Sequence, residues 1–67
     1  MAITLKAARV NAGLTQQEAA LKLGITRGTL ANYEKYKTKP DIALAKKIAD
    51  LYGTTVNGII FSPSDCA

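Results

Sequence analysis

The chain has 67 residues, of which 48% are hydrophobic and 21% are charged, and its net charge is +4. A chain of this length buries only about 60% of its unfolded surface, so it has no room for a second core or for an enzyme's closed pocket. Histidine is absent and the single cysteine is Cys66. Histidine chemistry, an internal disulfide and a cysteine-rich zinc site are therefore excluded.

Eleven alanines and an aromatic content of 6% favour packed helices over a sheet. The longest apolar runs have four residues, as at 42–45, whereas a membrane span needs roughly 20. The first ten residues contain no apolar core of the signal-peptide type. We therefore expect a cytoplasmic protein without a membrane segment, a metal, a cofactor or a small-molecule substrate.

A threonine or an aspartate precedes each predicted helix, in a position to cap it. The predicted N-caps are Thr4, Thr15, Thr26, Asp41 and Thr55. The corresponding five helices cover residues 5–12, 16–23, 27–35, 42–52 and 56–60. Residues 62–67 are polar and lack periodicity, so we predict a mobile tail after a single domain that covers residues 1–61.

The second and third predicted helices are separated by a turn of about three residues that contains Gly24. This arrangement forces the two helices to cross at a large angle. The sequence from Leu14 to Glu34 resembles the helix-turn-helix of the Cro and lambda-type repressor family, also called the Xre family, and the resemblance extends over about residues 5–61. Three further features strengthen it: Arg9, the pair Tyr33-Glu34, and the loop Lys37-Thr38-Lys39-Pro40. The resemblance implies an all-α fold, a compact five-helix bundle of the lambda-repressor-like type.

The resemblance also implies that the N-terminal end of the third helix enters the major groove of DNA. Four residues on its outward face are the candidates for base reading: Arg27, Gly28, Thr29 and Asn32. Arg27 can form a bidentate pair with guanine, and Asn32 can pair with adenine or reach a phosphate. Thr29 can offer a methyl group to thymine or a hydroxyl to a phosphate. Gly28 replaces the polar side chain usual in the family, so it either lets DNA approach the backbone or makes no base contact.

A second set of residues is expected to bind DNA phosphates: Gln16, Lys35, Tyr36, Lys37 and Lys39. Gln16 resembles the family's phosphate-clamping glutamine, at a helix N-terminus whose dipole favours an anion. The lysines would neutralise phosphates on the other side, with free solvation as the alternative for each of them. Tyr36 departs from the family pattern, because glycine or asparagine is common at this helix end.

Arg9 lies beside the apolar stripe of the first predicted helix, which is an unfavourable place for a charge. The resemblance places it against Glu34 in a mostly buried ion pair, and a buried charge needs such a partner. DNA contact is the alternative role of Arg9. We expect the structural role.

These features predict a sequence-specific regulator of transcription, most like a phage or prophage repressor of the Cro type, that binds double-stranded DNA as a homodimer. A chain without a second domain would be regulated through its concentration, a partner protein or proteolysis. The predicted dimer interface consists of apolar residues toward the C-terminus: Leu44, Leu51, Val56, Ile59 and Phe61. The alternative role of these residues, above all of Ile59, is to complete the core of the monomer. The alternative function is a protein-interaction module on the same fold, such as an antitoxin-like or anti-repressor subunit. Enzyme activity is not expected, because no candidate nucleophile has a base partner at a suitable spacing.

Overall fold

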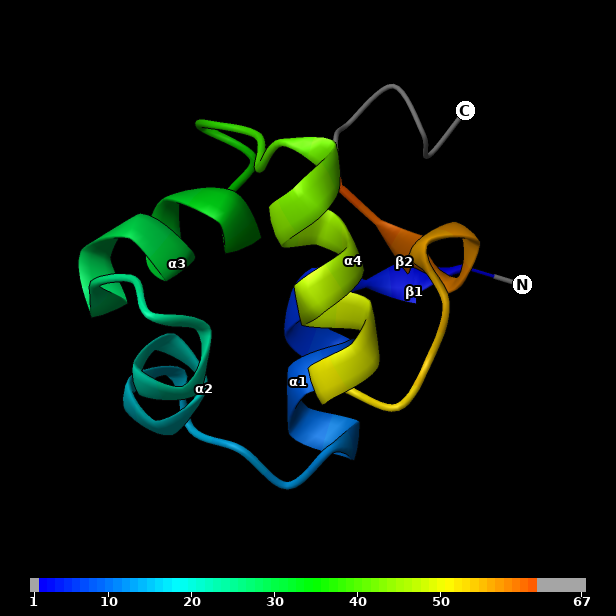
Figure 1. Ribbon diagram of the computed structural model, residues 1–67, viewed down its shortest axis with the longest axis horizontal. Coiled ribbons are helices and arrows are strands. Elements are labelled where there is room, and N and C mark those ends of the chain that lie inside the picture. Colours follow the sequence, from blue (N-terminus) through cyan, green and yellow to red (C-terminus); the bar gives the residue numbers. More distant parts are fainter. Residues whose placement is uncertain (1, 62–67) are drawn as a thin grey trace.

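The computed structural model describes residues 2–61, and within them it contains four α-helices, one 3-10 turn and two very short strands (Figure 1). The helices are α1 (Leu5–Asn11), α2 (Gln16–Leu23), α3 (Arg27–Glu34) and α4 (Ile42–Leu51), and the 3-10 turn is η1 (Val56–Gly58). The strands are β1 (Ile3–Thr4) and β2 (Ile59–Ile60). The predicted tail over residues 62–67, with Cys66, lies outside the described residues.

Each α-helix begins where a side chain caps it. Thr4 Oγ1 accepts a hydrogen bond from the Ala7 N–H at 3.1 Å, and Asp41 Oδ1 accepts one from the Leu44 N–H at 2.8 Å. Thr15 forms both hydrogen bonds of a capping box with Glu18, and the bond from the Thr15 backbone is the main cause of the lowered pKa of Glu18. The predicted caps of α1 to α4 are therefore confirmed. Each contributes about 1 kcal/mol to helix stability.

The core joins all four helices. Leu5 of α1, Leu30 of α3 and Ile48 of α4 are the largest fully buried side chains of residues 2–61, and Ala20 of α2 is also buried. Complete burial of a leucine or isoleucine side chain stabilises the fold by roughly 1.5–3 kcal/mol. In Figure 1, α2 and α3 lie on one side of α4, while the strands and η1 lie on the other. The core therefore holds α3 at the end of the molecule away from the strands.

The prediction of five α-helices is wrong at its last member. Within residues 2–61, the segment expected to form the fifth helix is instead a 3-10 turn followed by β2. β2 pairs in parallel with β1, with Ile3 opposite Ile59 and Thr4 opposite Ile60. Branched side chains at these positions suit an extended chain. The fold is thus mostly helical, with a minimal sheet that joins the two ends of the described chain.

Candidate nucleic-acid interface

The helix α3 exposes its N-terminal half and buries one face. Leu30 is fully buried, whereas Arg27, Gly28 and Asn32 are exposed and Thr29 is half-buried. Tyr33 is also half-buried, and the Glu34 side chain is almost completely buried. The outward face of α3 therefore holds most of the residues predicted to read bases.

Thr29 is hydrogen-bonded to Thr26, the N-cap residue of its own helix. Its N–H donates to Thr26 Oγ1 at 3.1 Å, and the two hydroxyl oxygens are 2.8 Å apart. Because this hydroxyl is already hydrogen-bonded, a contact between Thr29 and a base would rest mainly on its methyl group.

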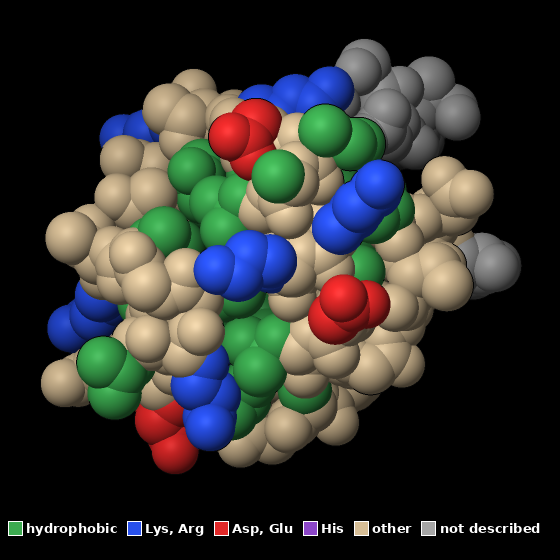
Figure 2. All heavy atoms as spheres, viewed as in Figure 1, with side chains coloured by type: hydrophobic (Ala, Val, Ile, Leu, Met, Phe, Trp, Pro, Cys, Tyr) green, Lys and Arg blue, Asp and Glu red, His purple; other side chains and the backbone are tan. Residues whose placement is uncertain are grey.

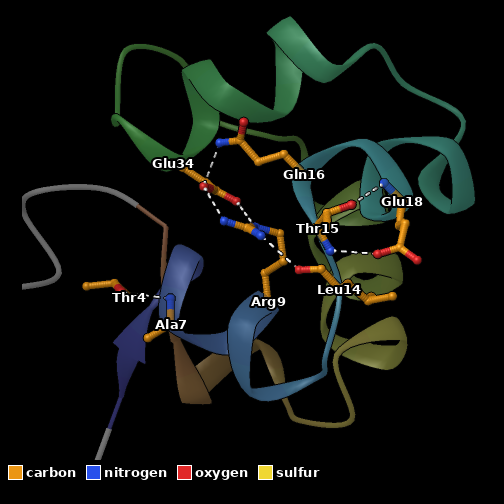
Figure 3. Close-up of polar contacts among 8 residues, drawn as sticks. All are labelled: Thr4, Ala7, Arg9, Leu14, Thr15, Gln16, Glu18 and Glu34. Carbon is orange, nitrogen blue, oxygen red and sulfur yellow. Dashed lines mark hydrogen bonds and ion pairs between the residues drawn. The ribbon is translucent and has the colours of Figure 1, made fainter.

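The Arg9 guanidinium binds Glu34 at the far end of α3 (Figure 3). Arg9 Nε donates to Glu34 Oε2 at 2.7 Å, and Arg9 Nη1 donates to the Leu14 carbonyl at 2.8 Å. The two charged side chains are only 9% and 5% exposed, so the pair is almost completely desolvated. A buried charge of this kind depends on its partner. The pair therefore ties α1 to α3 and leaves Arg9 in a structural position.

Gln16, the first residue of α2, joins the same network. Its Nε2 donates to Glu34 Oε1 at 2.9 Å (Figure 3), so the Glu34 carboxylate holds both α1 and α2 against α3. In the isolated chain this side chain is bound to Glu34 and is half-buried. The first N–H groups of α2 have no partner within the helix, so the backbone beside Gln16 still suits an anion. The sequence pattern did not indicate the bond to Glu34.

Gln16 and Arg27 border two hollows in the surface. The first, here called the α3 hollow, has a volume of about 410 Å³ and is lined by Gln16, Arg27, Gly28, Ala31 and Lys35. The second has a volume of about 560 Å³ and adds Lys6 and Arg9 of α1 to the lining. Arg9 is neutralised by Glu34, but Arg27 and Lys35 line the first hollow and Arg27 and Lys6 line the second. Among residues 2–61 neither lining includes an acidic side chain, and such a surface attracts a polyanion.

A left-handed residue ends α3 and starts the lysine-rich loop. Tyr36 has a φ of 60°, a conformation that glycine usually provides at a helix end. The Lys37 N–H donates to the Asn32 carbonyl at 2.9 Å and the Tyr36 N–H donates to the Tyr33 carbonyl at 3.1 Å, which together form a Schellman motif. A side chain in this conformation costs about 1–2 kcal/mol. Tyr36, which stands where the family commonly has glycine or asparagine, therefore occupies a strained backbone position.

The lysines predicted to bind phosphates are accessible. Lys35, Lys37 and Lys39 are all exposed, and they follow one another at the end of α3 and in the loop after it. On the face shown in Figure 2, however, basic side chains are scattered among apolar and polar ones. The positive charge is therefore not confined to the neighbourhood of α3.

The residues predicted for a dimer interface are less exposed than expected. Ile59 and Phe61 are 4% and 5% exposed and complete the core, which was the alternative role of this set, so they present almost no apolar surface to a partner. The pairing of β2 with β1 draws this segment into the molecule. Leu44, Leu51 and Val56 are half-buried and pack against the core.

Other large apolar side chains are exposed instead. Leu21, Ile42 and Val10 have exposed fractions of 81%, 68% and 57%, respectively. Ile42 lines a further hollow of about 510 Å³ with Lys39, Pro40 and Phe61 among its neighbours.

Tyr52 ends α4 with a buried hydroxyl. Tyr52 is 7% exposed, and its Oη makes no hydrogen bond to any of the described residues. Burial, assisted by the nearby Glu34 charge, raises the pKa of Tyr52 to about 12. The phenol is thus kept neutral over the whole physiological range.

Several transcriptional regulators are similar to this chain. ImmR, an HTH-type transcriptional regulator of Bacillus subtilis, is 41% identical over 56 residues, which are 84% of this chain and 44% of that protein. An uncharacterized HTH-type transcriptional regulator of Methanocaldococcus jannaschii is 39% identical over 61 residues, which are 91% of this chain and 92% of that protein. The chain thus spans less than half the length of the Bacillus protein. No solved structure shows significant similarity to the chain.

A family model described as helix-turn-helix matches residues 5–59, which include all four α-helices of the described chain. None of the helices formed by residues 2–61 is long and apolar enough to cross a membrane. The resemblance drawn from residues 14–34 is confirmed by the family match and by the relatives. The chain belongs to the Xre, or Cro/C1-type, helix-turn-helix family of DNA-binding transcriptional regulators.

Proposed function

We propose that this protein is a Cro-type repressor of phage or prophage character that binds a two-fold symmetric operator as a homodimer in the cytoplasm. The observation that carries the proposal is the exposed head of α3. There Arg27 stands beside the α3 hollow, whose lining within residues 2–61 includes Lys35 and no acidic side chain. A helix end with these properties fits the major groove, whose guanine edges accept a bidentate arginine.

The proposed contacts are of two kinds: contacts to bases, which recognise the sequence, and contacts to phosphates, which position the protein on DNA. Arg27 reads guanine, and Asn32, exposed on the same helix, reaches an adenine or a phosphate. Lys35, Lys37 and Lys39 neutralise phosphates along the backbone. Gln16 approaches a phosphate through the N-terminal N–H groups of α2, while its side chain remains on Glu34.

The proposed homodimer would lengthen the DNA site beyond the few base pairs that a single α3 can contact. A single α3 covers only a few base pairs, and so short a site recurs too often in a genome to specify an operator. Two-fold pairing would set two copies of α3 about 34 Å apart, one turn of DNA. Leu44, Leu51 and Val56 provide the partly exposed apolar surface for this pairing.

The decisive experiment is selection of bound duplexes from a random pool with the 67-residue chain. A two-fold symmetric consensus with a guanine in each half-site is the expected result. Enrichment of a single asymmetric site would contradict the dimer. An absence of enrichment, together with duplex binding that hardly changes with salt, would favour a protein-interaction module instead.

A further inference from the structure

The α3 hollow has a small-residue floor and a polar rim. Gly28 and Ala31 lie three residues apart on one face of α3 and contribute almost no side chain, so they form the floor. Arg27, Lys35 and Gln16 have long side chains and form the rim. The hollow therefore admits a group of modest size to the helix backbone itself.

No contact within the described chain requires glycine at position 28. A Cβ atom added there would meet no atom within 4 Å. By contrast, Gly24 has a φ of 72°, and a Cβ on Gly58 would lie 2.6 Å from Thr54 Oγ1. Glycine is also among the least favourable residues in a helix. The fold itself would therefore tolerate alanine at position 28, and the space beside Gly28 is open to a group that enters the hollow.

Two of the three rim side chains are cations. Arg27 and Lys35 can only donate hydrogen bonds, whereas the Gln16 amide, whose nitrogen donates to Glu34, keeps its oxygen as an acceptor. The two cations suit guanine and thymine, which present only acceptors as their hydrogen-bonding atoms in the major groove. Of the two suitable bases, thymine also carries a methyl group, and an apolar floor can contact it.

We propose that Gly28 keeps the α3 hollow open for the methyl group of a thymine, beside the base that Arg27 reads. This inference rests on the proposed function and adds a second base to its recognition. Gly28 is then a determinant of specificity through its lack of a side chain. Alanine at position 28 would fill the space that the thymine methyl occupies.

The first test removes the methyl group from the DNA. In the selected operator, each thymine of a half-site is replaced in turn by uracil, which keeps all hydrogen-bonding atoms. At one position the affinity of the wild-type chain should fall about fourfold, the effect of about one buried methyl group. Equal affinity for every uracil-substituted duplex would overturn the assignment of thymine.

The second test fills the hollow from the protein side. Gly28→Ala should raise the Tm by roughly 4–8 °C, because alanine is the better helix former. It should nevertheless weaken operator binding by about 5- to 150-fold, the range expected for overpacking by one methyl group. The uracil-substituted operator should lose less affinity, since space has been restored on the DNA side.

Ala43 supplies the matched control. It is exposed and occupies the second position of α4, as Gly28 occupies the second position of α3. Ala43→Gly should lower the Tm and leave operator affinity unchanged. The double variant Gly28→Ala/Ala43→Gly should return the Tm toward the wild-type value and still bind weakly, which separates affinity from stability.

The outcomes distinguish this inference from the proposed function. If the wild-type chain binds its operator, Arg27→Ala weakens that binding and Gly28→Ala does not, only the role of Gly28 is wrong. If the wild-type chain selects no duplex, the proposed function fails and the role of Gly28 fails with it.

Discussion

At the scale of single residues, Arg27 and Tyr52 illustrate two ways in which a polar group is placed. Arg27 is exposed at the head of α3. Tyr52 is buried, and its hydroxyl makes no hydrogen bond within residues 2–61. Arg27 is available to a partner, whereas the buried hydroxyl of Tyr52 lowers the stability of the molecule.

Replacing Arg27 by alanine should weaken operator binding by roughly 1–3 kcal/mol and relax the preference at one base pair of each half-site. Binding to random duplex should change little, because the lost contact is to a base edge. Titrations of both duplexes at one salt concentration measure the difference. Lys22→Ala on α2 removes the same charge from an exposed site and serves as the control. Equal losses on both duplexes would assign Arg27 to the phosphates.

Replacing Tyr52 by phenylalanine should raise the free energy of unfolding by about 1 kcal/mol, because a buried unpaired hydroxyl is removed. The pKa of Tyr52 is about 12 in the folded chain, against an ordinary value of 10.0. Folding therefore favours the neutral phenol, and this stability is present below pH 10 and is lost as the pH rises toward 12.

In the wild-type chain, the free energy of unfolding should fall by about 3 kcal/mol as the pH rises from 10 to 12, because each pKa unit corresponds to about 1.36 kcal/mol. Urea unfolding between pH 8 and pH 12 should show this decline in wild type and a smaller one in Tyr52→Phe. Tyr33→Phe is the control, because Tyr33 is only half-buried and should leave the decline in place. A parallel pH dependence in wild type and Tyr52→Phe would contradict the prediction.

At the scale of elements, the Arg9–Glu34 pair determines how three helices meet. Arg9 comes from α1, Glu34 ends α3, and Gln16 at the start of α2 donates to the same carboxylate. The head of α3 and the N-terminus of α2 are thereby fixed relative to each other. The orientation of the candidate DNA surface thus depends on a buried group that itself need not touch DNA.

Arg9→Ala should destabilise the fold by roughly 3–5 kcal/mol, because it leaves the Glu34 carboxylate buried without a cation. The double variant Arg9→Met/Glu34→Leu should recover much of that loss, since it removes both charges and keeps the volume. Urea unfolding of wild type and of the two variants measures the comparison. An unchanged Tm in Arg9→Ala would show that the pair does not hold the helices.

The lysine-rich loop after α3 gives a second prediction at the scale of elements. Lys37 follows the left-handed Tyr36 and is exposed. If it lies on a phosphate, Lys37→Ala should weaken binding to all duplexes alike and reduce the slope of log affinity against log salt by about 1. Lys46→Ala, an exposed lysine on α4, is the comparison and should keep the wild-type slope. An unchanged slope in Lys37→Ala would leave that lysine in free solvent.

At the scale of the whole molecule, the apolar surface decides how a dimer can form. Phe61 is in the core, so Phe61→Lys would bury an unpaired charge and unfold the chain before it tested any interface. The half-buried Leu51 is the better probe. Its partial exposure leaves room for a charged group at the surface.

Leu51→Lys should shift the wild-type dimer to monomer at micromolar concentration, with helix content unchanged. Ile42→Lys places the same charge at a site on α4 that is already 68% exposed, and it should leave the assembly intact. Sedimentation and circular dichroism measure the two properties. A wild-type chain that remains monomeric, both free and on its symmetric operator, rules out the homodimer.

The sequence alone was sufficient for features whose interactions lie within a few residues. The caps at Thr4, Thr15, Thr26 and Asp41 were predictable because each side chain bonds to an N–H three residues ahead. Two short helices with a turn between them followed from this local punctuation, and the helix-turn-helix followed from the resemblance of residues 14–34 to the Xre family. The unusual end of α3 was likewise visible, because tyrosine stands where glycine is common.

Contacts between distant parts of the chain were decided only by the tertiary structure. The parallel pairing of Ile3 with Ile59 replaced the expected fifth helix and drew Phe61 into the core. The bond from Gln16 to Glu34 likewise joins the start of α2 to the end of α3. Neither contact leaves a pattern in a local stretch of sequence. Both form because the packed helices bring these groups within hydrogen-bonding distance while water is excluded.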